Sequence, residues 1–174
     1  ASFEMGIGML THVFNAMPGL NHKDPGPIGA ALIQGEVAMG LIADGTHVHP
    51  AIAVMIQKLA ADQLFIVSDA LAPYGLNQTT FEWNKRKLII DNGVCKLEHG
   101  TLAGTTISLL EACKRIACWT NEPSWAIWAA TVSPRFVLKQ KRDTQELLIG
   151  KSLKGLLRWN FNFQSKSLNW NQAK

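Results

Sequence analysis

Short runs of apolar residues, each followed by polar and turn-forming residues, recur through the first half of the chain. Three such runs cover residues 7–10, 37–43 and 64–67. Near-continuous apolar runs are typical of strands in a parallel sheet that is buried on both faces. Apolar residues at helical spacing fill 50–61, and a shorter helical turn is expected at 28–33. Strands that alternate with helices in this way predict βα units.

The pattern changes after residue 80, where the spacing predicts antiparallel strands. These expected strands cover residues 81–83, 87–90 and 94–97. The tripeptide Asp91-Asn92-Gly93 predicts a tight hairpin turn between the last two of them. A helix over 107–119 should follow, with Thr105 or Thr106 as its N-cap. The remaining elements expected are helices at 123–131 and from 133, and a hairpin of 155–163 with 167–170.

A histidine or an aspartate follows each apolar run of the first half: His12, His47 and Asp69. At the carboxyl ends of the strands of a (β/α)8 barrel, such residues reach a common active site. Two histidines and a carboxylate suit a divalent metal with an acid/base group. A lone histidine is more often a hydrogen-bonded structural residue, but three such coincidences of position weaken that alternative.

Composition narrows the possible classes of protein. Of the 174 residues, 47% are hydrophobic and 17% are charged, which predicts a globular domain. The net charge is +4, and the basic runs near residues 139–142 and 151–154 are interpreted as a solvated face. We expect no nucleic-acid partner, because no aromatic residues interleave with these lysines and arginines. No apolar stretch approaches about 20 residues, so no membrane span is expected. Three cysteines without CxxC spacing favour reduced thiols in a cytoplasmic protein.

Five motifs in series resemble one family. Segments 11–17, 22–26, 43–48, 68–73 and 100–106 read THVFNAM, HKDPG, ADGTHV, SDALAP and GTLAGTT. Their order and spacing, over about residues 8–135, resemble the N-acetylglucosamine-6-phosphate deacetylase family of the amidohydrolase superfamily. The resemblance implies a metal-dependent (β/α)8 barrel with a small β domain formed by both chain ends. It also implies hydrolysis of N-acetylglucosamine 6-phosphate to glucosamine 6-phosphate and acetate.

The resemblance implies roles for the three strand-end residues. His12 matches a metal-ligating histidine, and the metal is expected to be zinc or iron. His47 matches a histidine that contacts the substrate and polarises the acetyl carbonyl. Asp69 matches the catalytic acid/base, which takes a proton from metal-bound water and passes one to the leaving amine.

The same resemblance implies a site for the sugar phosphate. Asn15 and Ala16 match positions that hold it through side-chain and backbone groups. Lys23 stands where the family usually has an arginine that contacts the phosphate across a dimer interface, so a homodimer is expected. Lysine keeps the charge but lacks the bidentate fork of arginine. A loop that lines the substrate pocket through its backbone corresponds to Leu102, Ala103 and Gly104.

Chain length limits what these motifs predict. A whole barrel needs about 250 residues. We therefore expect an α/β fold: the last three barrel strands with their helices in 1–145, and the C-terminal strands of the small β domain in 146–174. Only one protein metal ligand, His12, is identified, whereas a catalytic zinc site typically has three. The chain alone is therefore expected to be inactive.

Two alternatives stay open. In one, the chain is a non-catalytic fragment or a degraded gene product. In the other, it belongs to an amidohydrolase that acts on another N-acyl sugar or on a cyclic amide.

Overall fold

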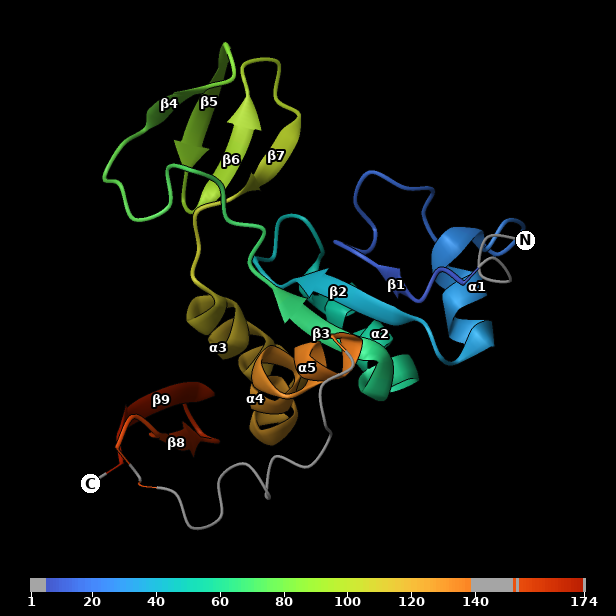
Figure 1. The fold of residues 1–174 in the computed structure, drawn as a ribbon, viewed down its shortest axis with the longest axis vertical. Helices are drawn as coiled ribbons and strands as arrows, with labels where there is room; N and C mark the ends of the chain where they lie inside the picture. The colour runs from blue at the N-terminus through green and yellow to red at the C-terminus, as the bar shows by residue number, and fades with distance from the viewer. Residues whose placement is uncertain (1–5, 139–151, 153, 174) are drawn as a thin grey trace.

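The computed structural model describes residues 6–138, 152 and 154–173. Its centre is a parallel sheet in the order β1-β2-β3 (Figure 1). The strands are β1 (Met9–Leu10), β2 (Ala38–Ile42) and β3 (Leu64–Val67). All neighbouring pairs are parallel, which confirms the three strands expected from the apolar runs. The expected domain boundary between residues 145 and 146 lies outside the described residues.

Helices pack around this sheet. They are α1 (Gly26–Gln34), α2 (Pro50–Ala60), a 3-10 turn (Ala61–Gln63), α3 (Leu109–Thr120), α4 (Pro123–Thr131) and α5 (Ser133–Val137). The predicted helices are confirmed, and α1 is a nine-residue helix where a helical turn was expected. No helix in the described part of the chain is long and apolar enough to cross a membrane.

An antiparallel sheet follows β3 in the chain and stands above the parallel sheet in Figure 1. Its strands are β4 (Thr80–Trp83), β5 (Arg86–Asp91), β6 (Val94–Leu97) and β7 (Leu102–Thr105). The turn between β5 and β6 has positive φ at both central residues, 49° at Asn92 and 84° at Gly93. This is the backbone that a type I′ hairpin requires, so the predicted turn is confirmed.

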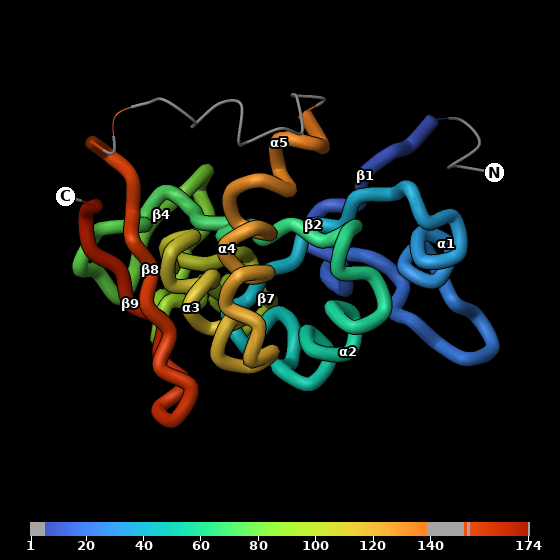
Figure 2. Tube along the Cα trace, turned by 90° about the horizontal axis from the view of Figure 1, so that it is seen from below, coloured from blue at the N-terminus to red at the C-terminus, as the bar shows by residue number. Residues whose placement is uncertain are grey.

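A separate hairpin closes the chain. It consists of β8 (Leu157–Asn162) and β9 (Ser167–Gln172), and β9 packs against α3. Leu168 of β9 is buried in the same apolar cluster as Cys113 and Ile116 of α3. Figure 2 shows this hairpin and α1 at opposite ends of the molecule, with α3 and α4 between them.

The core lies where β2 and β3 meet the helices. Leu41 and Leu64 are fully buried, as expected for strands that are covered on both faces. Two side-chain hydrogen bonds join α5 to the first residue of β3 and α4 to the 3-10 turn before that strand. The Ser133 hydroxyl donates to the Leu64 carbonyl at 2.7 Å, and the Trp125 indole donates to the Ala61 carbonyl at 3.1 Å. These bonds fix α5 against β3 and α4 against the 3-10 turn.

The N-cap of α3 differs from the prediction. Neither Thr105 nor Thr106 caps the helix; the Ser108 hydroxyl does, accepting from the Glu111 N–H at 3.0 Å. The reason is that Thr105 still belongs to β7, and its hydroxyl donates to the Ser68 carbonyl at 2.6 Å. The chain therefore needs three more residues before it can turn into the helix.

Candidate functional site

The loops that follow the three parallel strands lie at one edge of the sheet. Parallel pairing places the carboxyl ends of β1, β2 and β3 together, so the loops with His12, His47 and Asp69 share that edge. Pairing continues beyond β1, because the Val13 N–H donates to the Gly40 carbonyl at 2.8 Å. The structure thus places the three predicted site residues, His12, His47 and Asp69, on neighbouring loops.

Asp44 organises the loop after β2. One carboxylate oxygen, Oδ1, accepts the backbone N–H groups of Thr46 at 2.9 Å and His47 at 2.8 Å. The other, Oδ2, lies 2.6 Å from Nδ1 of the His47 ring. Since a carboxylate only accepts hydrogen bonds, Nδ1 carries the proton and Nε2 is left for a ligand. The same aspartate therefore makes the turn and orients the histidine.

The charge of Asp44 is favoured despite its burial. Its side chain is fully buried, and that of His47 is 4% exposed. Burial alone would raise the pKa of the Asp44 carboxyl. The hydrogen bonds from the His47 side chain and the two backbone N–H groups, with the attraction of the ring, outweigh burial and lower this pKa below its ordinary value of 3.8. A buried, ionised Asp44 favours a His47 ring that is held in one orientation.

Asp69 adopts an unusual backbone at the end of β3. Its φ is 50°, in the left-handed region that few non-glycine residues adopt. Thr105 of β7 holds this conformation. The Thr105 N–H donates to the Asp69 carbonyl at 2.9 Å, and the Thr105 carbonyl accepts the Leu71 N–H at 2.9 Å. Strained backbone that its surroundings hold in place is typical of functional positions.

Gly104 allows β7 to approach Asp69. Its φ is 146°, and an ideal Cβ at this position would lie 2.8 Å from the Asp69 carbonyl oxygen. Because backbone atoms cannot yield as a flexible side chain does, only glycine fits here. Gly104, one of the predicted pocket residues, therefore supports the backbone of Asp69.

The loop after β1 carries His12, Asn15 and Ala16. His12 Nδ1 lies 3.1 Å from the Asn15 carbonyl and so donates to it, leaving Nε2 as a potential ligand. The Asn15 side chain donates to the Val13 carbonyl at 3.2 Å. Positive φ values occur at His12 (33°), Phe14 (74°) and Ala16 (51°). The loop is a tight turn that presents the ring of His12 beside exposed backbone.

Lys23 lies in the segment between β1 and α1 and is exposed. Its backbone N–H donates to the Asn21 side chain at 2.9 Å, which fixes the turn but leaves the ammonium group in solvent. Within the described residues, the structure therefore presents Lys23 outward, as a cation available to an external anion.

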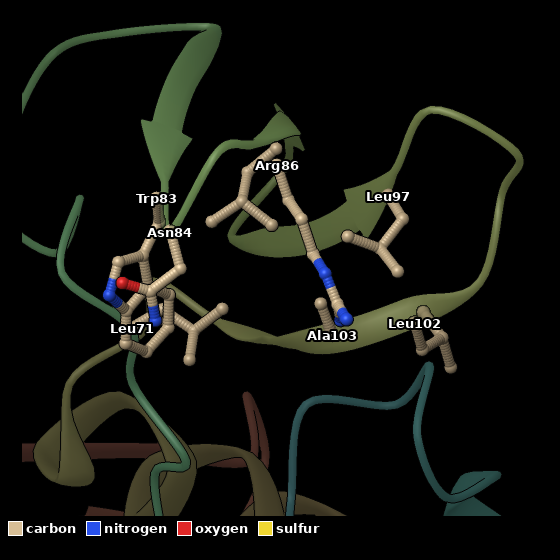
Figure 3. Close-up of a pocket in the computed structure, with 8 residues that line it drawn as sticks. Leu71, Trp83, Asn84, Arg86, Leu97, Leu102 and Ala103 are labelled. Atoms are coloured by element: carbon tan, nitrogen blue, oxygen red, sulfur yellow. The ribbon is translucent and has the colours of Figure 1, made fainter.

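A pocket of about 510 Å³ lies beside β7 (Figure 3). Its lining includes the predicted residues Leu102 and Ala103, together with Leu71, Trp83, Asn84, Arg86, Leu88 and Leu97. In Figure 3 the Arg86 side chain extends from β5 toward Ala103, between Leu71 and Trp83 on one side and Leu97 on the other. The wall of this pocket thus offers apolar surface, an indole ring and one guanidinium group.

The metal requirement is not met by the residues that the structure describes. They contain no group of three histidine, cysteine, aspartate or glutamate side chains arranged to hold a metal ion. A catalytic zinc site typically takes three protein ligands. His12 has the tautomer that a ligand needs, but it does not form a ligand set with the other described residues.

The relatives that the chain resembles in sequence are amino-sugar-phosphate deacetylases. No family model matches the chain. The N-acetylglucosamine-6-phosphate deacetylase of Vibrio furnissii is 31% identical over 152 residues, which are 87% of this chain and 38% of that relative. The putative N-acetylgalactosamine-6-phosphate deacetylase of Escherichia coli K12 is 32% identical over 128 residues, 73% of this chain and 77% of that relative. The chain thus spans under two fifths of the Vibrio furnissii enzyme.

Solved structures agree with the sequence comparison. N-acetylglucosamine-6-phosphate deacetylase of Thermotoga maritima matches 79% of this chain and 39% of its own, with a TM-score of 0.73 and 26% identity. A mutant of the Mycobacterium smegmatis enzyme, in complex with N-acetyl-D-glucosamine-6-phosphate, matches 80% of this chain and 38% of its own, with a TM-score of 0.75 and 25% identity. The chain belongs to the N-acetylglucosamine-6-phosphate deacetylase family.

Three residues of the site were not identified from the sequence: Thr105, Glu111 and Arg115. The sequence predicts Thr105 or Thr106 as a helix cap, whereas Thr105 holds the Asp69 backbone. Arg115 donates from Nη1 to the Asp44 carbonyl at 2.6 Å and from Nε to Glu111 at 2.9 Å. The four-residue spacing of Glu111 and Arg115 is a visible sequence signal of an ion pair on a helix, but it does not show what the pair contacts.

Proposed function

We propose that the chain serves as the C-terminal portion of a deacetylase that converts N-acetylglucosamine 6-phosphate to glucosamine 6-phosphate and acetate. In this proposal β1, β2 and β3 are the last three strands of a (β/α)8 barrel, and β8 and β9 belong to its small β domain. The observation that carries the proposal is Asp69, held in a left-handed conformation by Thr105 at the edge where the loops of His12 and His47 also lie.

Asp69 serves as the acid/base in the proposed reaction. Its carboxylate makes no hydrogen bond or ion pair with another described residue, so it is free to accept a proton from the attacking water. The water oxygen bonds to the acetyl carbon, the proton moves to Asp69, and Asp69 then protonates the amine nitrogen. The carbon–nitrogen bond breaks, and acetate and the amino sugar leave.

The remaining residues bind and orient the substrate. His47, whose Nδ1 is bonded to Asp44, directs Nε2 to the acetyl carbonyl oxygen. Asn15 and Ala16 hold the sugar phosphate, and the loop of Leu102, Ala103 and Gly104 lines the substrate pocket through its backbone. Leu102 and Ala103 also line the cavity beside β7. Lys23, exposed before α1, reaches the phosphate bound by a second subunit, which makes the enzyme a homodimer.

A divalent metal, zinc or iron, is part of the proposal. It would supply Lewis-acid activation of the carbonyl and water. His12 provides one ligand through Nε2, and because the described residues offer no complete set, the other protein ligands lie elsewhere in the enzyme. A cytoplasmic location fits the three cysteines, which are all free in the structure.

The proposal is tested by restoring a complete enzyme. The 174-residue chain is fused after the portion of the Vibrio furnissii relative that it does not cover, and acetate release is measured with zinc or iron. We expect activity, and a fall of about 1,000-fold in the Asp69→Asn variant. Asparagine tolerates the left-handed backbone, so the variant should unfold at the same urea concentration as the parent. An inactive fusion that folds and binds metal, or an active Asp69→Asn variant, would contradict the proposal.

A second substrate is favoured by the curated relatives themselves. Two relatives, from Shewanella and from Escherichia coli O157:H7, are N-acetylgalactosamine-6-phosphate deacetylases and are 33% and 32% identical to the chain. The two sugars differ only in the orientation of one hydroxyl group. Comparing kcat/KM of the fusion for the two sugar phosphates identifies the preferred one, and unphosphorylated N-acetylglucosamine serves as the control for phosphate recognition.

A further inference from the structure

Three residues of α3 form a stripe that faces the loop with His47. Glu111, Arg115 and Trp119 are spaced four residues apart, so they lie on one face of the helix. Arg115 donates to the Asp44 carbonyl at 2.6 Å. Trp119 lies against Gly45, where an ideal Cβ would be 3.4 Å from the indole ring. One helix face therefore contacts two successive residues of the loop.

We propose that Arg115, oriented by Glu111, is a positioning residue that fixes the Asp44–His47 pair and hence the direction of His47 Nε2. This inference rests on the proposed function, since it assigns a role in presenting His47 to the substrate.

A chain of hydrogen bonds connects Glu111 and Arg115 to the His47 ring through Asp44. Glu111 accepts from Arg115 Nε at 2.9 Å, which leaves Nη1 directed at the loop. Arg115 Nη1 holds the Asp44 main chain while the Asp44 carboxylate holds the main chain of Thr46 and the ring of His47. Contacts at the main chain and at the carboxylate of Asp44 thus together determine the position of the His47 ring.

The contact is chemically suited to this role. Arg115 is half-buried, so its hydrogen bond to the Asp44 carbonyl is charge-assisted and partly shielded from water. The charged groups joined to His47 through these bonds are Asp44, Arg115 and Glu111. Arg115 thus holds the main chain of the residue whose carboxylate accepts the hydrogen bond from His47 Nδ1. Removing Arg115 should therefore loosen the ring without removing any group that touches the substrate.

The first test observes His47 directly in the 174-residue chain. Long-range nitrogen–proton NMR spectra report which ring nitrogen carries the proton. We expect Nδ1 to be protonated in the parent chain, and its population to fall about twofold in Arg115→Met, because the Nδ1–Asp44 geometry is no longer fixed. Hydrogen-exchange protection of the His47 amide should fall about tenfold.

Matched variants separate positioning from a general loss of structure. Lys114→Met removes the same charge one position along α3; because Lys114 makes no hydrogen bond or ion pair with the described residues of the His47 loop, both signals should stay unchanged. Glu111→Gln leaves Arg115 in place with a weaker partner and should give an intermediate effect, which keeps the test decisive should Arg115→Met not fold. Unchanged His47 signals in both Arg115→Met and Glu111→Gln overturn the inference.

The second test uses the fusion described above. Arg115→Met should lower kcat about tenfold with KM changed by less than about twofold, since a small displacement of a polarising group affects the transition state most. Arg115→Lys should restore part of kcat, because its ammonium can reach the Asp44 carbonyl. A fusion without acetate release would refute the proposed function while the NMR result still decides the positioning role. Equal kcat in parent and Arg115→Met would overturn the inference.

Discussion

The loops after β1 and β2 each present a histidine, but they differ in how far the chain itself determines their geometry. In the β2 loop, the buried carboxylate of Asp44 accepts three hydrogen bonds. Oδ1 accepts from the backbone N–H groups of Thr46 and His47, and Oδ2 accepts from Nδ1 of the His47 ring. Arg115 adds a further bond from α3. In the β1 loop, His12 is oriented by one bond to the Asn15 carbonyl, within the same turn.

The difference follows from the position of the two strands. β2 is the central strand and is paired on both sides, and Leu41 within it is fully buried. β1 is a two-residue strand at the edge, and its Met9 is 46% exposed. A loop that leaves a central strand can be supported by neighbours on every side, whereas one that leaves an edge strand has support from one side. Contacts from a second element therefore fix the histidine of the β2 loop, whereas the histidine of the β1 loop is oriented within its own turn.

Deleting the key hydrogen-bonding group of each loop tests this difference most strongly. Asp44→Ala should lower the free energy of unfolding by about 4 kcal/mol, because it breaks a buried pair and leaves two N–H groups without an acceptor. His12→Ala removes one hydrogen bond at a half-buried position and should lower it by less than about 1 kcal/mol. Urea unfolding followed by circular dichroism gives both values. Equal losses would show that the two loops are equally supported.

Truncating a side chain in β2 should also cost more stability than truncating one in β1. Leu41→Ala in β2 should lower the free energy of unfolding by about 3 kcal/mol, since it leaves a cavity in a fully buried site. Met9→Ala in β1 should lower it by less than about 1 kcal/mol, because the side chain is 46% exposed. The same urea titration measures both variants. A loss at Met9 as large as that at Leu41 would mean that β1 is covered in solution.

Much of this arrangement is predictable from the sequence. The apolar runs identify the parallel strands because burial on both faces leaves little choice of residue. The Asn92-Gly93 pair identifies its turn because both residues tolerate positive φ. The same apolar runs place His12, His47 and Asp69 after the ends of strands. In each case a local rule of backbone or burial determines the structure.

The support of the site is not predictable in the same way. Thr105 binds Ser68 and Asp69, which lie 37 and 36 positions earlier, and Arg115 binds Asp44 across 71 positions. Such contacts depend on how the sheets and α3 come together, and no local pattern encodes them. The incorrect N-cap assigned to Thr105 or Thr106 has the same origin, because a threonine hydroxyl that suits a helix start is used by a distant carbonyl.

The contribution of Asp44 to the stability of the β2 loop should depend on pH. Its pKa is lowered in the folded chain, so the charged form contributes stability above the unfolded value of 3.8, and this contribution is lost as pH falls through the lower, folded value. The stability difference between the parent and Asp44→Asn should therefore be larger at pH 6 than at pH 3. Urea unfolding at the two pH values measures it, with Asp24→Asn, an exposed residue near the β1 loop, as the control. A difference that does not change with pH would show that the Asp44 carboxylate is not favoured by folding.

The smallest expected effect is a gain of stability in the β1 loop. Ala16 has a φ of 51°, in the left-handed region where a Cβ costs about 1 kcal/mol or more, and its side chain is exposed. Glycine removes that strain but loses more backbone entropy on folding, so Ala16→Gly should raise the free energy of unfolding by about 0.5 kcal/mol. Ala51→Gly, at an exposed position in α2 with ordinary helical backbone, should lower it instead. If Ala16→Gly also destabilises the chain, the left-handed turn is held by its surroundings as firmly as the β2 loop, and the contrast between the two loops is smaller than their hydrogen bonds indicate.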